Sequence, residues 1–170
     1  MRAFLVGLAL TLLAGPSLAA NADCLWEATP AAERDALLAS YDRDLGGLLK
    51  TQLPSDRIQA LADACAVPQM QHGQIRDLVL ARALETASGR YWARRTGRAF
   101  AIEQAWMSLS EEDKDQLRRW AATAIADGRG EEKYFDALPR FAVLMQATAP
   151  EMPHLIAFIL GRGYRELMSD

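Results

Sequence analysis

The stretch from Gln69 to Arg95 carries apolar residues around more than half of a helical wheel. A helix with so wide an apolar arc does not suit the surface of a protein, because much of that arc would stay in water. We therefore expect a central helix with the other helices packed around it. Its apolar positions are Ile75, Leu78, Val79, Leu80, Ala83, Leu84, Ala87 and Tyr91, and its polar strip is Gln74, Asp77, Arg82, Glu85 and Ser88.

Helical spacing of apolar residues also precedes and follows this stretch, and no stretch shows the two-residue alternation of a strand. Thr29 before Pro30 predicts the start of the first helix, because proline fits a first turn. Thr96-Gly97 predicts a break after the central helix, and Ser110 predicts the cap of a later one. The patterns predict an all-α, single-domain bundle of about seven or eight helices around the central helix, at roughly 69–95.

Near the carboxyl terminus, Gly163 lies on the stripe of a helix that would otherwise be apolar. Glycine costs a helix interior ~1 kcal/mol relative to alanine, so it needs a compensating reason. A close approach of another helix is such a reason, and we interpret Gly161-Arg162-Gly163 as a packing contact rather than a phosphate loop. The stripe consists of Ile156, Ile159, Leu160, Tyr164 and Leu167.

Residues 1–20 have the order of a secretory signal peptide, with Arg2, an apolar run over 3–14, a Gly15-Pro16 break and small residues up to Ala20. The apolar run is too short to cross a bilayer, which takes about 20 residues. We therefore expect residues 1–20 to be removed and residues 21–170 to form one α-helical domain. That domain is expected in the periplasm of a bacterium and does not span the membrane.

Cys24 and Cys65 are the only cysteines, and oxidising compartments favour disulfides. Cys65 follows Ile58, Leu61 and Ala62 at helical spacing, so it is expected to face inward. A Cys24–Cys65 disulfide would fix the amino-terminal segment to the core. Two free, buried thiols are the alternative.

The composition of the chain argues against disorder and against nucleic-acid binding, but it does not indicate a particular function. Apolar residues make up 51% of the chain, which argues against disorder, and the net charge is −3. A mildly acidic, exported chain has no electrostatic reason to bind nucleic acid. The tryptophans Trp26, Trp92, Trp106 and Trp120 are expected in the core, and any that is exposed would mark a binding surface.

Four arginines, Arg90, Arg94, Arg95 and Arg98, stand close together beside Tyr91 and Trp92. Guanidinium groups form a planar fork of donors that suits phosphate or carboxylate, so the arginines are candidates for binding an anionic lipid, a glycan or an acidic protein. In the alternative interpretation the two aromatic residues belong to the core. The arginines then pair with the acidic run at 111–115.

The segments Glu85-Thr86-Ala87-Ser88-Gly89 and Leu144-Met145-Gln146-Ala147-Thr148 resemble short motifs of lytic transglycosylases of the soluble lysozyme type. Those are exported helical enzymes with a catalytic glutamate. The resemblance implies that Glu85 is a general acid in peptidoglycan cleavage. Thr86 and Val143 stand where that family has serine and glycine, and the two segments lie much farther apart than in the family. In the alternative interpretation Glu85 is a surface carboxylate near Arg82.

His72 and His154 are the only histidines, and neither has a ligand at a spacing typical of a metal site. We expect no metal and no cofactor. The favoured hypothesis is a non-catalytic binding module that contacts another envelope protein, through an apolar groove or through the surface formed by residues 90–98. The alternatives are binding of an anionic envelope component by the four arginines, and peptidoglycan cleavage by Glu85.

Overall fold

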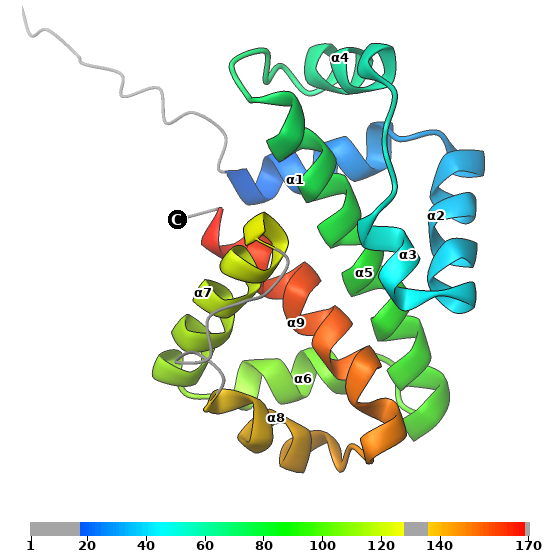
Figure 1. The fold of residues 1–170 in the computed structure, drawn as a ribbon. Helices are drawn as coiled ribbons and strands as arrows, with labels where there is room; N and C mark the ends of the chain where they lie inside the picture. The colour runs from blue at the N-terminus through cyan, green and yellow to red at the C-terminus, as the bar shows by residue number, and fades with distance from the viewer. Residues whose placement is uncertain (1–17, 128–135, 169–170) are drawn as a thin grey trace, which may run out of the picture.

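The computed structural model describes residues 18–127 and 136–168 (Figure 1). Within these ranges the chain forms nine α-helices, one 3₁₀ turn and no strand, which confirms the all-α prediction. The elements are α1 (Leu18–Ala28), α2 (Ala31–Arg43), α3 (Leu45–Leu49), α4 (Ser55–Ala64), α5 (His72–Thr96), α6 (Ala101–Ser108), α7 (Glu111–Asp127), α8 (Ala137–Met145), the 3₁₀ turn Ala149–Glu151 and α9 (Met152–Leu167).

Helix α5 is the predicted central helix, and it packs against α1, α2, α4, α6 and α9. Its apolar positions from Ile75 to Leu84 are buried, as the helical wheel predicts. Glu85 and Ser88 of the expected polar strip are buried as well, which corrects that part of the prediction. Both lie on the face of α5 that also carries Ala81, and α9 packs against this face.

The sequence predicts that α9 buries a single stripe of residues. In the structure α5 and α7 both pack on α9, so it is buried on two sides. Two glycines allow the close approach. A Cβ at Gly161 would stand 2.4 Å from the carbonyl oxygen of Ala81 in α5, and one at Gly163 would stand 3.1 Å from Cβ of Ala121 in α7. The predicted packing role of these glycines is therefore confirmed.

The amino-terminal part differs from the prediction. Helix α1 precedes the expected first helix and buries Ala22, Leu25 and Trp26. Thr29 does not cap α2, since its hydroxyl donates to the carbonyl of Leu25 and thus ends α1, and Pro30 occupies the cap position of α2. Helix α1 begins inside the predicted signal peptide, and residues 1–17 lie outside the described residues.

Later helix ends follow the predicted signals. Helix α5 ends at Thr96, and Gly97 has the left-handed conformation with φ 67°. The backbone N–H of Asp113 donates to Oγ of Ser110 at 3.1 Å, so Ser110 caps α7. Gly128, the expected end of α7, lies outside the described residues.

The predicted disulfide is present and joins α1 to the end of α4. Cys24 and Cys65 are bonded, with their Cα atoms 5.8 Å apart, and Cys65 is buried. All four tryptophans are buried too, so none of them marks a binding surface.

Among the described residues, no single helix has the length and apolar character needed to cross a bilayer. Helix α8 and the segment Ala149–Leu167 meet that criterion only as a pair, and the two are bent by 108° at the break between them.

Candidate functional site

Glu85 lies in the middle of α5, where α9 packs closest, and its side chain is buried. Its Oε1 accepts hydrogen bonds from Arg162 and Arg165, both at 3.0 Å. Its Oε2 accepts hydrogen bonds from Arg82 and Arg165, both at 2.9 Å. Three guanidinium groups, two of them from α9, therefore surround one carboxylate.

The surroundings of Glu85 keep it ionised. Burial alone raises the pKa of this carboxyl, because the charged form loses its hydration. The hydrogen bonds and charge of Arg165, followed by the charges of Arg82 and Arg162, outweigh burial and hold the pKa below its ordinary value. A general acid in glycoside hydrolysis needs a raised pKa. The geometry therefore gives no support to glycan cleavage by Glu85.

A second carboxylate, Glu166 of α9, extends this network to two further helices. It accepts a hydrogen bond from Arg118 of α7 at 2.9 Å and one from the indole N–H of Trp106 in α6 at 3.2 Å, and it also pairs with Arg162. The charged groups of this network are thus engaged with one another. We interpret the network as structural, joining α5, α6, α7 and α9.

The arginine cluster, Arg90, Arg94, Arg95 and Arg98, lies on the last turns of α5 and the turn that follows, and all four residues are exposed. Within the described chain, Arg95 alone of the four forms an ion pair, with Glu151. The hydrogen bonds of Thr148, followed by the one from Arg95, lower the pKa of Glu151 to about 2. The acidic run at 111–115 does not pair with the cluster; its partners are Lys114, Arg118, Arg119 and Arg140.

The aromatic residues beside the cluster pack within the fold, Trp92 completely and Tyr91 in part. Trp92 is fully buried, and Tyr91 stacks on His154 with ring centroids 3.6 Å apart. Nδ1 of His154 lies 2.8 Å from the hydroxyl of Tyr41. Burial lowers the pKa of His154 and raises the pKa of Tyr41, which favours a neutral hydrogen-bonded pair. Trp92 is therefore not available to stack on a ligand, and one face of Tyr91 is already covered by His154.

The described residues contain no group of three side chains that could hold a metal ion. His72 begins α5, whereas Tyr91, on which His154 stacks, lies near the end of that helix. Nineteen residues of α-helix span about 28 Å, so the two histidines are too far apart to share an ion.

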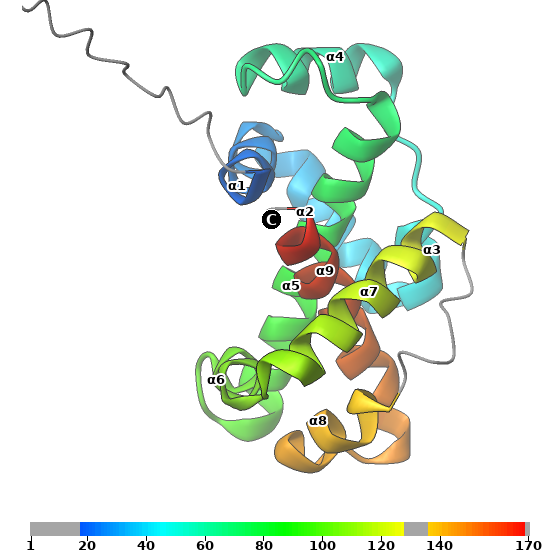
Figure 2. The same cartoon turned by 90° about the vertical axis from the view of Figure 1, so that its left-hand side faces the viewer.

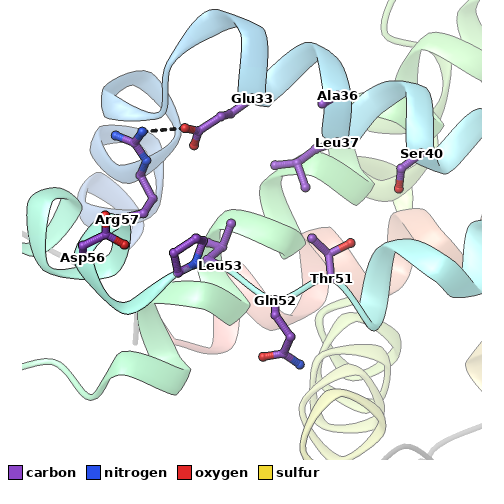
Figure 3. Close-up of a pocket in the computed structure, with 10 residues that line it drawn as sticks. Glu33, Ala36, Leu37, Ser40, Thr51, Gln52, Leu53, Asp56 and Arg57 are labelled. Carbon is purple, nitrogen blue, oxygen red and sulfur yellow. Dashed lines mark ion pairs between the residues drawn. The ribbon is translucent and has the colours of Figure 1, made fainter.

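A groove lies between α2 and the non-helical connection Thr51–Pro54, which joins α3 to α4 (Figure 3). Its volume is about 340 Å³, near the lower limit for a small-ligand site. Leu37 of α2 and Leu53 of the connection point toward one another across it, and the ion pair between Glu33 and Arg57 spans one end. The lining residues are Glu33, Ala36, Leu37, Ser40, Thr51, Gln52, Leu53, Pro54, Asp56 and Arg57.

The connection on the far side of the groove carries unused backbone hydrogen-bonding groups. The N–H of Thr51 donates to the carbonyl of Leu48, and the carbonyl of Pro54 accepts the N–H of Ile58. Within the described chain, the backbone groups of Gln52 and Leu53 make no hydrogen bond. Because backbone polar groups need a partner, these groups are available to water or to a ligand.

No sequence motif marks this groove. Its walls come from α2, the connection and the first turn of α4, and each contributes ordinary residue types. The sequence-based hypothesis of an apolar groove named no residues for it. The groove described above is formed by the packing of these three segments. The sequence-predicted candidates Glu85 and the arginine cluster lie outside its lining.

No family model, no curated protein and no solved structure matches this chain.

Proposed function

We propose that the protein is a non-catalytic binding module of the bacterial envelope that holds an extended segment of a partner protein in the groove between α2 and Thr51–Pro54. The observation that carries this proposal is the pairing of apolar walls with unused backbone groups. Leu37 and Leu53 supply the walls, and Gln52 and Leu53 supply the backbone donors and acceptors.

An extended peptide satisfies both features at once. Its backbone can hydrogen-bond to that of the connection, as in recognition by strand addition, and an apolar side chain can enter the space between the two leucines. Side chains of an extended segment alternate, so only every second one would face the groove. A ligand without a backbone would leave the groups of Gln52 and Leu53 in water.

Charge at the groove favours a basic residue next to that apolar side chain. Glu33 is neutralised by Arg57, whereas Asp56 is exposed and has no ion pair in the described part of the chain. We therefore expect a preference for lysine or arginine close to the apolar residue. The contribution of each such pair is small, because Asp56 is solvated.

Export to the envelope is supported by the order of residues 1–20 and by the disulfide between Cys24 and Cys65. An extended peptide in that compartment would come from another envelope protein, through a linker or a chain terminus.

The test is selection of random linear peptides on the protein, followed by affinity measurement against two variants. Ala36→Phe places a ring in the groove from an exposed position of α2, and Ala39→Phe makes the same change at an exposed position outside it. We expect the selected peptides to bind the wild type and Ala39→Phe equally and to lose roughly tenfold or more in affinity with Ala36→Phe.

Hydrogen exchange provides a second measurement on the same peptides. The amides of Gln52 and Leu53 should exchange more slowly in the complex, and Asp56→Asn should weaken the selection of basic residues. Peptides that bind Ala36→Phe as well as the wild type, or that leave these two amides unprotected, would contradict the proposal.

A further inference from the structure

Exposed apolar side chains gather at one end of the molecule, away from the groove. In the described part of the chain, four of the five large hydrophobic residues that are exposed belong to α6, α8 or the turn before α6. Helices α6 and α8 pack together at the lower end of both views (Figure 1, Figure 2). The four are Phe100, Met107, Val143 and Leu144, with exposed fractions of 69%, 65%, 75% and 49%.

The arginine cluster reaches the same end, because α5 runs down to it and turns into α6 (Figure 1). Arg94 and Arg98 are exposed, and neither has an ion pair among the described residues. Arg95 is paired with Glu151 but keeps 47% of its side chain exposed. The positive charge of the arginine cluster is therefore only partly neutralised by ion pairs.

A hollow of about 320 Å³ joins the basic and the apolar features. Arg95 and Thr96 line it from the end of α5, Arg98 from the turn that follows, and Leu144 from α8. Guanidinium donors and an exposed leucine thus border the same space. This is the combination that a phosphate head group next to hydrocarbon requires.

We propose that this end, formed by Arg94, Arg95, Arg98 and the exposed residues of α6 and α8, docks on the surface of an anionic phospholipid bilayer. The arginines contact lipid phosphates, and Val143 and Leu144 enter the layer beneath the head groups. Among the anionic envelope components considered, phospholipid is favoured because only a bilayer offers hydrocarbon to these side chains as well as phosphate to the arginines.

Acidic groups next to the arginine cluster are already paired, whereas Glu112 and Asp136 near Arg140 of α8 are exposed and offset part of the attraction. Glu151 is already paired with Arg95, and Asp113 at the start of α7 is paired with Arg140. Glu103 of α6 is half-buried. Charges elsewhere that give the chain its net −3 act weakly here, because the Debye length at physiological ionic strength is about 8 Å.

The experiment is co-sedimentation of the exported protein with vesicles of phosphatidylglycerol and phosphatidylethanolamine, compared with vesicles of phosphatidylcholine. We expect binding to the anionic vesicles that weakens as salt is raised toward about 1 M, where the Debye length is ~3 Å. Replacing Arg94 and Arg98 by alanine should lower the binding constant roughly tenfold or more, since each basic residue near an anionic surface contributes about fivefold.

Two further double variants distinguish binding to a bilayer surface from binding to a free anion. The double lysine variant Arg94→Lys with Arg98→Lys should keep most of the binding, because an anionic surface attracts any positive charge. A site that depends on the two-pronged hydrogen bonding of arginine would lose its ligand in this variant. The double variant Val143→Ser with Leu144→Ser should weaken binding to anionic vesicles. Leu49→Ser is its control, because Leu49 is exposed on α3.

The proposal is overturned if anionic vesicles do not retain the protein, if the lysine variant loses binding like the alanine variant, or if the serine variant binds like the wild type. Competition by millimolar inorganic phosphate would also overturn it, in favour of a site for a free anion. Ala36→Phe fills the groove and should leave vesicle binding unchanged, so the failure of one proposal is distinguishable from the failure of the other.

Discussion

Glu85 illustrates how far the environment of a single residue departs from what its sequence neighbours suggest. Arg82 lies three positions away on the same helix, so its pairing with Glu85 could be predicted. Arg162 and Arg165 lie 77 and 80 positions away, and nothing local connects them to Glu85. Because α9 packs on α5 and brings these two arginines to Glu85, this carboxylate is buried at the centre of a charged cluster instead of lying at the surface.

This burial predicts a large effect of removing the charge. In Glu85→Gln the three arginines lose the carboxylate that they share, although Arg162 keeps Glu166 and Arg82 keeps Asp23. Breaking a buried ion pair from one side costs about 3 kcal/mol or more. We expect the free energy of unfolding in guanidinium chloride to fall by about that amount. Glu112→Gln, an exposed change on α7, should stay within about 0.5 kcal/mol of the wild type and serves as the control. Equal stability of the two variants would contradict this account.

At the scale of helices, the contact between α5 and α9 decides the architecture. A glycine on the apolar stripe of a helix predicts the close approach of another helix, and Gly163 gave this prediction for α9. Which helix comes close could not be predicted, because the partners α5 and α7 are distant in sequence. The periodicity of α9 also underestimated its burial, since Leu155, Ala157 and Phe158, which lie outside the predicted stripe, are buried as well.

The helix contact is tested by adding one methyl group. In Gly161→Ala the new Cβ would meet backbone atoms of Ala81 and Glu85 at 2.4 and 2.6 Å, so α5 and α9 must separate. Overpacking of this kind costs roughly 1–3 kcal/mol, which thermal unfolding should show as a lower midpoint.

Gly73→Ala is the matched control for this change. Gly73 lies in the first turn of α5, and a Cβ there would contact nothing within 4 Å. Because alanine is the better helix former, this variant should be as stable as the wild type or more stable by up to ~1 kcal/mol. A destabilised Gly73→Ala, or an unaffected Gly161→Ala, would contradict the packing argument.

At the scale of the whole molecule, the disulfide fixes the amino-terminal helix to a core built mainly by later segments. Cys24 in α1 and Cys65 after α4 are separated by 41 positions. Helix α1 also packs on α5, and its Leu25 and Trp26 belong to the buried core. The pairing could be predicted because the chain has only two cysteines and carries a sequence typical of export.

Removing the disulfide should destabilise the protein without unfolding it. Closing a loop of 41 residues stabilises a fold by about 4 kcal/mol in the chain-entropy model, and the buried face of α1 remains when the bond is absent. We expect Cys24→Ser with Cys65→Ser to lower the free energy of unfolding by no more than about 4 kcal/mol. A reducing agent should lower the free energy of unfolding of the wild type by the same amount and leave that of the double variant unchanged. A wild type that is insensitive to reduction would contradict this prediction.

The two proposed binding surfaces are formed by different helices. The groove is lined by residues of α2, α4 and the connection between α3 and α4, whereas the basic, apolar end is formed by the end of α5 with α6 and α8. The two sets share no residue. This separation would let one molecule hold a peptide while it rests on a lipid surface.

The sequence by itself determined what depends on neighbouring residues or on residue type: the helical class, the central position of α5, the end of α5 at Thr96, the cap of α7 at Ser110, and the pairing of the only two cysteines. Each of these follows from local periodicity, capping or residue type. Only the tertiary structure decided the arginines around Glu85, the groove between α2 and Thr51–Pro54, and the apolar end beside Arg98. The arginines around Glu85 and the apolar end arise where segments distant along the chain meet, and local patterns carry no information about which segments will do so. The groove is formed within residues 33–57, but it depends on how the connection and α4 fold back beside α2, which local patterns do not fix either.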